Sequence, residues 1–517
     1  MNINAISPLT TLYICRGVPL DSTYTDTLRF TSVQNQINYF AGRAKITEND
    51  HGEIKLKNTI RVPYNANELY DCNYVVFRSN AFNGKWFFAF IKDINYASVA
   101  SSHIVFEIDV MQTWFFDMNI NRCLVEREHS NTDNIGDNLV YEPFDIGDYI
   151  SEVPEKTEHF AQYSIVICIV APPDYLHDMF IFNNSGYIGG LFTGAGYVGI
   201  EMNFNNLTGF ENSLTNIDTA LRMIENAGQG DNIIAVIQMP SAFVETQSIS
   251  VSARVRSDAT LEKEYIGAYR PRNKKLLCYP YNFLYTHDGG GGSAIYRYEY
   301  FDSNSTCGFF LDCGMSPDPE IILAPIGYNG SSVNWDEKLT MKGFPQCAYA
   351  IDTFRAWLAQ KGTATALSAL GSTAAIIGGA ASGNAMVAFG GALGLANSIN
   401  SVVVAAAQPP QTKGHQGNST MVANLAKNFY FVNKHITEEY ARILDDYFTR
   451  YGYQTNRVKT PNITGRPVFN YVKTQQANIT GNISFDDLAK IKSIFDSGVT
   501  FWHNPANVGR YDLSNQP

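Results

Sequence analysis

Residues 194–199, which read GAGYVG, have the glycine spacing of a dinucleotide-binding turn. In that motif a tight turn delivers a pyrophosphate to the N-terminus of the helix that follows. Here the next residues, 200–204 (IEMNF), alternate like a strand and do not open a helix. We therefore interpret the motif as a glycine-rich turn and expect no nucleotide cofactor.

Two groups of titratable residues have the types that acid–base chemistry uses. His129 belongs to a dense charged cluster with Glu126, Arg127 and Glu128, and Asp109 stands among apolar neighbours. For the His129 cluster a structural charge network, solvated or facing another subunit, is favoured over catalysis. For Asp109 a paired, buried carboxylate is favoured over a general base. No carboxylate pair stands out as a glycosidase dyad, and sequence distance cannot reveal one.

The remaining catalytic and metal-binding motifs are absent from the sequence. It has no P-loop, HExxH, nucleophile-elbow or EF-hand pattern, and its nine His are dispersed. The eight Cys form no CxxC and no zinc-like spacing with His, so we expect free, mostly buried thiols from a reducing compartment. They are Cys15, Cys72, Cys123, Cys168, Cys278, Cys307, Cys313 and Cys347. We expect no catalytic residue, cofactor or metal, and thus no enzyme.

Composition limits the class of protein further. With 517 residues the chain is long enough for two or more domains. The formal net charge of −11 argues against a surface that grips nucleic-acid phosphates, although DNA could still slide past such a surface. Residues 1–17 lack the basic start and long apolar run of a signal peptide, so we expect no secretion.

The most unusual stretch is residues 362–412, between Lys361 and Lys413, which contains no Asp, Glu, Lys, Arg or His. About a quarter of the residues in an ordinary globular protein are charged. A polar break at residues 382–384 separates two halves, 363–381 and 385–407, each close to the roughly 20 residues that cross a bilayer as a helix. Small residues recur every fourth position, a spacing that lets helices approach closely in lipid.

We predict that this segment is a membrane-active loop, formed as a helical hairpin or a pair of arms. Its Ala and Gly content makes it less hydrophobic than a permanent membrane span, which suits a segment that stays soluble and then inserts. A small-residue hairpin buried in a soluble core or at a subunit interface is the main alternative, and a disordered linker is a third. The predicted membrane-active residues are Leu367, Leu370, Gly371, Ile376, Ile377, Gly379, Gly383, Val387, Phe389, Gly390, Leu393, Gly394, Leu395, Ile399, Val402, Val403 and Val404.

The elements around this loop are mostly strands. Aromatic residues make up 13% of the chain, and aromatic or β-branched runs alternate with turns from 12 to 116, a pattern typical of an antiparallel barrel or sandwich. Strands are also predicted at 163–170, 233–238, 429–432 and 468–472, with aromatic strand-like runs between 276 and 347.

Three helices are predicted. One covers 212–227, with Gly228 as its stop, and one follows Thr437 and ends before Gly452. A third begins at Ser484, ends before Gly498, and is expected to bury Phe485, Leu488, Ile491 and Phe495.

The predicted fold class is therefore β-rich, with mainly antiparallel barrel or sandwich domains, α+β parts and one long hydrophobic loop insertion. We divide the sequence into an N-terminal β-rich domain (1–150), a middle α+β segment (151–270), a β-rich segment (271–361), the hydrophobic loop (362–412) and a C-terminal α+β segment (413–517).

Several runs together resemble the tail knob, or distal tail tube, proteins of small short-tailed bacteriophages of the phi29 type. They are 17–21 (GVPLD) with 24–30, 38–40 (NYF), 106–114 (FEIDVMQTW), 125–129 (VEREH), 274–283 (KKLLCYPYNF) and 498–503. None is a chemical signature, so the resemblance rests on their number and order along most of the chain.

The resemblance implies a virion protein at the distal end of the tail, in a homohexameric ring around a lumen for viral DNA. It makes 1–150 a β-rich tube domain and 413–517 the segment that completes the tube. It also implies contacts with other tail proteins, and hydrophobic loops that plug the lumen and later form a pore in the host cytoplasmic membrane. The chain is somewhat short for that family, which argues against a receptor-binding or wall-degrading role in addition.

Two other functions remain as alternatives. A receptor-binding tail protein would engage host cell-wall glycans through aromatic surface, and would be retained on walls without affecting lipid vesicles. A wall hydrolase would release soluble wall fragments.

Overall fold

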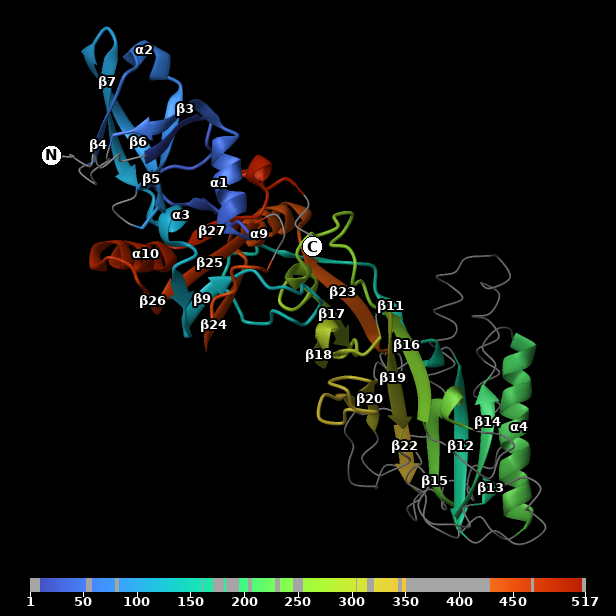
Figure 1. The fold of residues 1–517 in the computed structure, drawn as a ribbon. Helices are drawn as coiled ribbons and strands as arrows, with labels where there is room; N and C mark the ends of the chain where they lie inside the picture. The colour runs from blue at the N-terminus through green and yellow to red at the C-terminus, as the bar shows by residue number, and fades with distance from the viewer. Residues whose placement is uncertain are drawn as a thin grey trace, which may run out of the picture. The chain divides into compact units, whose positions relative to one another are not determined.

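A computed structural model describes residues 10–52, 58–79, 83–160, 162–170, 181–182, 195–202, 207–227, 233–244, 254–303, 305–313, 320–342, 346–349, 428–465 and 469–513. The structure divides into two units, each built from separate parts of the sequence (Figure 1). Unit 1 consists of Met1–Gly147, Ile266–Cys278 and Thr437–Pro517, and unit 2 of Asp148–Tyr265 and Tyr279–Ile436. The five-part division of the sequence remains a prediction.

Unit 1 contains a six-stranded antiparallel sheet in the order β3-β1-β5-β6-β7-β4. Its side chains alternate between two buried faces, with Tyr74 and Val76 on one and Val75 and Phe77 on the other. The antiparallel strands predicted between 12 and 116 are thus confirmed. They are β1 (Thr10–Arg16), β3 (Ala44–His51), β4 (Thr59–Val62), β5 (Cys72–Ser79), β6 (Lys85–Ser98) and β7 (Ser101–Ile108).

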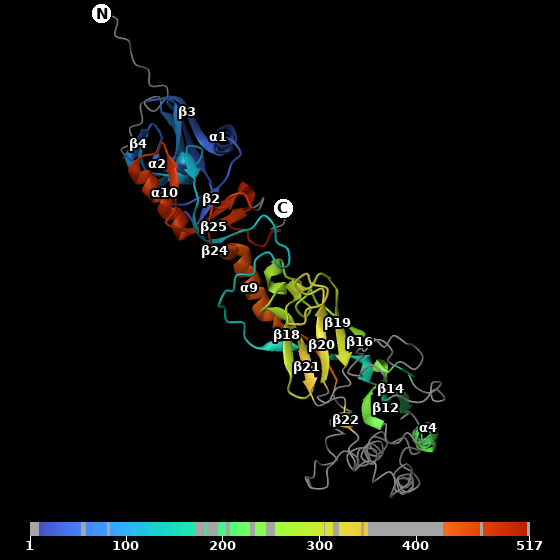
Figure 2. The same ribbon diagram turned by 90° about the horizontal axis from the view of Figure 1, so that it is seen from below.

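The second sheet of unit 1 combines strands from both ends of the chain. Its order is β2-β27-β25-β9-β24, and only the β2–β27 pair is parallel among these contacts. Figure 2 shows β24 and β25 in the orange of the C-terminal part. The strands are β2 (Asp26–Leu28), β9 (Cys123–Glu128), β24 (Tyr453–Lys459), β25 (Phe469–Gln475) and β27 (Val499–Trp502), and a separate pair joins β8 (Met118–Ile120) to β26 (Ile479–Gly481).

Helices cover these sheets in unit 1. The described helices are α1 (Val33–Ala41), α2 (Ala66–Leu69), α3 (Val110–Trp114), α9 (Glu438–Tyr451) and α10 (Phe485–Ser497), with 3-10 turns η6 (Lys274–Leu277) and η9 (Pro505–Asn507). The caps of the two long C-terminal helices are as predicted. Thr437 accepts a hydrogen bond from the Tyr440 N–H and Ser484 from the Asp487 N–H. Gly452 and Gly498 follow with positive φ angles of 64° and 95°.

The burial predicted for Phe485 is wrong. Ile491 and Phe495 are buried in the core of unit 1, and Leu488 packs against that core. Phe485, however, is 84% exposed. It occupies the first helical position after the Ser484 cap, where the helix has not yet reached the apolar surface that covers its later turns.

Unit 2 contains three described sheets. One has the order β10-β23-β17-β18, with β11 also paired to β23, the second β13-β14-β12-β15-β22, and the third β16-β19-β20-β21. The strands are β10 (Tyr149–Ser151), β11 (Glu155–Lys156), β12 (Tyr163–Val170), β13 (Ile181–Phe182), β14 (Ala195–Met202), β15 (Ile233–Pro240), β16 (Arg254–Thr260), β17 (Asn282–His287), β18 (Ser293–Tyr296), β19 (Thr306–Cys313), β20 (Glu320–Ile326), β21 (Leu339–Lys342), β22 (Gln346–Tyr349) and β23 (Tyr430–Ile436).

The core of unit 2 joins side chains of its sheets, including Val166, Leu284, Phe309 and Phe431. Helix α4 (Leu207–Asn226) packs against β14, and 3-10 turns form at η2 (Glu158–Phe160), η5 (Ser241–Phe243) and η7 (Tyr298–Tyr300). Helix α4 begins five residues before the predicted start at 212. Gly209 lowers helix propensity by about 1 kcal/mol relative to alanine, which is too little to stop a helix held by packing.

Residues 195–199 of the glycine-rich motif are themselves part of strand β14, so the interpretation of the motif as a turn is wrong. The strand continues to Met202, which confirms that these next residues form a strand and do not open a helix. The predicted β-rich fold class is likewise confirmed.

Candidate functional site

All the residues predicted for the membrane-active loop, from Leu367 to Val404, lie between 350 and 427, outside the described residues. Their membrane role therefore remains a prediction. Among the helices that the structure describes, none is both long and apolar enough to span a bilayer.

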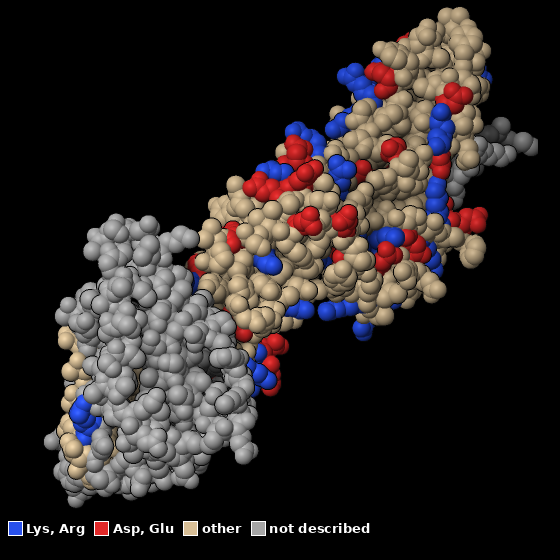
Figure 3. All heavy atoms as spheres, turned by 180° about the vertical axis from the view of Figure 1, so that it is seen from behind, with Lys and Arg blue, Asp and Glu red and all other residues tan. Residues whose placement is uncertain are grey.

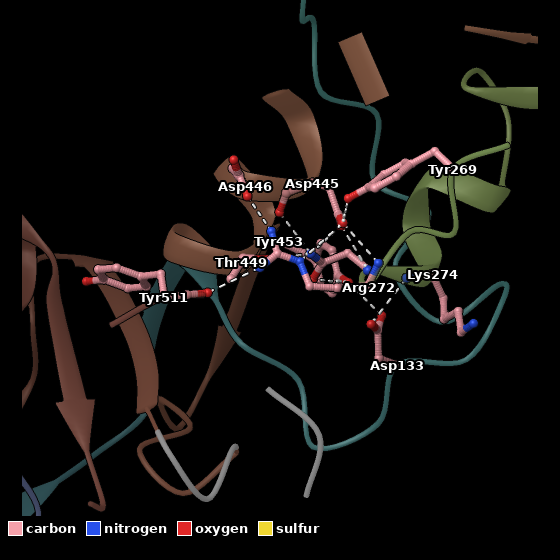
Figure 4. A network of polar contacts seen from close by, with 10 residues as sticks. Asp133, Tyr269, Arg272, Lys274, Asp445, Asp446, Thr449, Tyr453 and Tyr511 are labelled. Atoms are coloured by element: carbon pink, nitrogen blue, oxygen red, sulfur yellow. Dashed lines mark hydrogen bonds and ion pairs between the residues drawn. The ribbon is translucent and has the colours of Figure 1, made fainter. Parts of the chain in front are cut away.

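A network of hydrogen bonds and ion pairs in unit 1 surrounds the Asp445 carboxylate on α9 (Figure 4). Asp445 is fully buried. Its Oδ2 atom accepts hydrogen bonds from the Tyr269 hydroxyl at 2.6 Å and the Arg272 N–H at 2.9 Å. Its Oδ1 atom accepts from the backbone and side-chain N–H groups of Asn273 at 3.0 and 2.7 Å. These donors satisfy a buried charge that would otherwise be costly.

The site extends through Arg272 and Asn273. Arg272 also forms ion pairs with Asp445 and Asp446 and donates to the Tyr511 carbonyl at 3.2 Å. The Asn273 amide donates to the Thr449 hydroxyl at 2.8 Å. The stretch 269–273 is thereby fixed along the side of α9.

Asp133 closes the network from the opposite side, as Figure 4 shows. It accepts hydrogen bonds from the Tyr453 hydroxyl at 2.6 Å and from the Lys274 N–H at 3.2 Å. The same Tyr453 hydroxyl lies 3.1 Å from the Asn273 side-chain oxygen. Three distant sequence segments, around 133, 272 and 449, therefore meet in one hydrogen-bonded cluster.

A second buried cluster centres on Glu142. Its carboxylate forms ion pairs with Arg127 and, at 2.5 Å, with the Lys275 ammonium. Lys275 also donates to the Val140 carbonyl at 2.7 Å. Burial, and after it the Arg127 charge, lower the pKa of Lys275 to about 7. The Glu142 pairs fix the 130–147 connection to β9 and η6.

The solvated or subunit-facing position expected for the His129 cluster is wrong. His129, Glu128 and Arg127 are buried. The His129 Nδ1 atom accepts from the Tyr471 N–H at 2.7 Å, and Nε2 lies 3.1 Å from the Thr449 carbonyl oxygen. Glu126, Arg127 and Glu128 form the end of β9, an interior strand between β24 and β25, and His129 follows directly.

Asp109 is the buried, paired carboxylate that its apolar neighbours predicted. It caps α3 by accepting from the Gln112 N–H at 3.0 Å, and it accepts from the Tyr74 hydroxyl at 2.8 Å. Burial raises the pKa of Asp109 to about 6, and the hydrogen bonds from Gln112 and Tyr74 oppose that rise. These contacts give Asp109 a structural role.

A cavity of about 520 Å³ lies in unit 1 beside β24. It is lined by Glu128, Ser130, Gly136, Asp137, Asn138, Leu139, Val140, Gln454, Thr455, Arg457 and Lys459. Its volume falls within the range of ligand sites in proteins. The sequence patterns did not predict it, because its two walls lie more than 300 positions apart in the chain.

The chemistry of these clusters is that of structural attachment. The Asp445 and Asp109 carboxylates are held by hydrogen-bond donors from the surrounding elements, and Glu142 by cations. Within the described ranges no group of three or more His, Cys, Asp or Glu residues is placed to hold a metal ion. Cys15, Cys72, Cys123, Cys278, Cys307 and Cys313 are free and buried, as expected for these positions.

The attachment residues Asp445, Asn273, Glu142 and Lys275 were not predicted. For Asp445 a signal existed, because it directly follows Leu444 and stands three positions before Phe448, both on the apolar face of α9. A carboxylate at such a position must have partners. The partners themselves come from distant segments, so local patterns could not identify them.

Comparisons with known proteins agree with the strand-rich architecture. Residues 245–516 match the family described as Bacillus phage phi29, tail knob protein gp9, C-terminal domain, and residues 8–119 match the Caudoviral major tail protein N-terminus. The tail knob protein gp9 of Bacillus phage phi29 is 26% identical, over 98% of this chain and 98% of its own length, and that of Bacillus phage B103 is also 26% identical with the same coverage. The solved structure of the bacteriophage C1 tail knob protein gp12 is similar with a TM-score of 0.56 at 14% identity, covering 97% of this chain and 98% of that one.

Proposed function

Because the chain belongs to the family of the phi29 tail knob protein gp9, a structural component at the distal end of the phage tail, we propose that it forms a homohexameric DNA conduit. In this proposal its hydrophobic loops plug the lumen before ejection and then insert into the host cytoplasmic membrane as a pore. Other tail proteins and lipid are its further partners, and DNA passes without sequence-specific binding.

The observation that carries the membrane step is the uncharged segment 362–412. Moving apolar surface out of water releases about 25 cal/mol per Å², and no buried charge opposes the transfer in this segment. Its polar break at 382–384 gives two halves of nearly bilayer-spanning length. Six copies can surround an aqueous path if the Ser, Thr and Asn side chains face inward.

The charge distribution supports passage of DNA without tight binding. On the face shown in Figure 3, acidic and basic side chains are interspersed over the described surface. A continuous basic stripe would hold phosphates and slow the movement of a polyanion. The net charge of −11 is consistent with a wall that DNA can slide along.

The mechanism we propose is conformational and needs no catalytic residue. The buried Asp445 and Glu142 carboxylates hold separate chain segments together. The energy for membrane insertion comes from burying the apolar side chains of the released loop.

Dye release from liposomes tests the proposal, with purified protein at mildly acidic and neutral pH. The intact protein should cause leakage. Deletion of 363–407 should reduce the leakage at least about tenfold, and so should the triple substitution Ile376→Asp, Ile377→Asp and Phe389→Asp, because a charge buried in lipid is costly. The matched control is Val153→Asp, the same change at a described side chain that is 88% exposed in unit 2. This variant should cause as much dye release as the unmodified protein.

Ring assembly is measured on the same variants by electron microscopy. Leakage that survives the three Asp substitutions would show that the loop is not the membrane-active element. If neither the intact protein nor the deletion variant releases dye, and the deletion disrupts the ring, the segment is a packed structural hairpin. Retention on host cell walls without vesicle leakage would instead favour the receptor-binding alternative.

A further inference from the structure

The cavity beside β24 has one wall made by an edge strand. β24 is the last strand of its sheet. The opposite wall of the cavity is formed by a segment far away in sequence, which contains Gly136, Asp137, Asn138, Leu139 and Val140. A strand at a sheet edge offers unpaired backbone N–H and C=O groups to another chain.

The acidic groups of the cavity already have partners. Glu128 forms an ion pair with Lys459 and accepts from the Asn462 N–H at 2.9 Å. Asp137 accepts from the backbone and side-chain N–H groups of Asn134 at 3.0 and 3.1 Å. These carboxylates are therefore poorly placed to recruit a cationic ligand.

The donors of the cavity are less completely used. No hydrogen bond or ion pair joins the Arg457 guanidinium to another residue in the described parts of the chain. The Asn138 Nδ2 atom is buried and has no hydrogen-bond partner within the same described residues. A buried donor of this kind calls for an acceptor. The cavity is thus matched to a ligand that carries oxygen acceptors and negative charge.

The backbone of β24 is irregular next to Arg457. The pairing of β24 with β9 shifts register between Gln454 and Arg457, and Asn456 has a positive φ of 47°. Bulges of this type redirect a side chain and bend a strand. The next residue, Val458, is 62% exposed, so the edge also presents apolar surface.

We propose that this cavity binds an extended, acidic segment of another polypeptide, which pairs with β24 and places a carboxylate against Arg457. Strand addition to an open edge derives affinity from backbone hydrogen bonds and specificity from alternate side chains. The Gln454 N–H already donates to Glu142 at 3.2 Å, and the Val458 carbonyl accepts from Arg122 at 3.3 Å. The added strand therefore uses the edge between 455 and 459 and shares the Val458 carbonyl.

Charge makes this edge selective. Arg457 repels a basic strand and attracts an acidic one. The same side chain therefore opposes non-specific pairing at the strand edge and favours an acidic partner. A polypeptide fits better than a free anion, because the Arg457 guanidinium and the Asn138 side-chain amide lie beside the edge of a strand and not in an isolated anion site. The inference does not depend on the membrane function proposed above.

The test uses the full-length protein and two fluorescent probe peptides, one of alternating valine and glutamate and one of alternating valine and lysine. Fluorescence anisotropy should show binding of the glutamate peptide and little binding of the lysine peptide. Arg457→Glu should weaken the first about tenfold, equivalent to about 1.4 kcal/mol, and should strengthen the second. The control is Arg510→Glu, which removes an exposed cation elsewhere in unit 1 and should change neither.

Hydrogen exchange distinguishes strand addition from simple anion binding. The glutamate peptide should slow amide exchange between 455 and 459, and inorganic phosphate should neither do so nor displace the peptide. Equal binding of both peptides, or no binding of either, would overturn the proposal. Peptide binding without amide protection, or displacement by phosphate at similar concentration, would also overturn it, because the cavity would then be an anion site.

Discussion

Single buried carboxylates attach distant parts of unit 1 to one another. Asp445 is the clearest case, because both of its oxygens accept hydrogen bonds from residues 269–273 while its own backbone belongs to α9. Glu142 does the same between β9 and η6. Removing one partner of such a group leaves the others buried without compensation, which costs more than the pair itself contributes.

Asp445→Asn should destabilise unit 1 by about 2–4 kcal/mol, because an amide nitrogen would face the donors Tyr269 and Arg272 and the Arg272 charge would lose its buried partner. Urea unfolding followed by circular dichroism measures the change. The control is Asp446→Asn, whose side chain is 70% exposed and should cost less than about 1 kcal/mol. Equal effects of the two substitutions would contradict an attachment role for Asp445.

Asp109 should make stability depend on pH. Its pKa of about 6 in the folded protein exceeds the value of about 3.9 in an unfolded chain, so the folded state holds the proton more tightly. Protonated Asp109 therefore adds to the free energy of unfolding, and the two pKa values give a contribution of about 3 kcal/mol. This contribution is fully present below pH 4 and is lost as pH rises through 6.

Asp109→Asn should remove that dependence. Asparagine keeps a good helix cap but carries no charge, so the variant should match the parent near pH 4 and be more stable near pH 7. Chemical unfolding at both pH values gives the comparison. A variant less stable than the parent at pH 7 would mean that the ionised carboxylate stabilises the fold.

At the scale of elements, local chemistry predicted where helices begin and end better than what they bury. The caps at Thr437 and Ser484 have their expected partners because a cap depends on neighbours in sequence. Phe485 was misassigned because periodicity identifies a helical face but not how far the covering surface extends along it. The His129 cluster was misassigned because charged residues do not indicate that their strand lies inside a sheet.

The end of α9 combines a turn requirement with a steric one. Gly452 has a φ of 64°, and an added Cβ would lie 2.3 Å from the Glu128 carbonyl oxygen. Gly17 has a similar φ of 62°, but its added Cβ would lie 3.7 Å from the flexible Arg43 side chain.

Gly17→Ala should therefore cost only the left-handed backbone penalty of about 1–2 kcal/mol. Gly452→Ala should cost clearly more, because the backbone of β9 must also move. Thermal and urea unfolding of the two variants provide the comparison. A similar loss of stability in the two variants would show that the backbone where α9 meets β9 can shift with little loss of free energy.

The sequence predicted the strand content of the whole molecule but not its assembly from segments. The pairing of β9 with β24 and β25 joins residues more than 300 positions apart, and no local pattern encodes such a partner. The family resemblance covered most of the chain and is confirmed by the comparisons. The uncharged segment 362–412 was identified from composition alone, while the Asp445 network and the cavity required coordinates.

Unit 1 should fold only when its three segments are present together. Residues 1–147 alone would leave β9 without β24 and β25, and would expose core side chains such as Tyr74 and Phe88 that pack with Phe501 and Trp502. A protein of residues 1–147 should therefore aggregate or lack a cooperative unfolding transition. A single chain that joins 1–147, 266–278 and 437–513 through Gly/Ser linkers should be soluble and unfold in one transition. Cooperative unfolding of 1–147 alone, measured by calorimetry, would contradict this, because the six-stranded sheet would then be stable without the C-terminal strands.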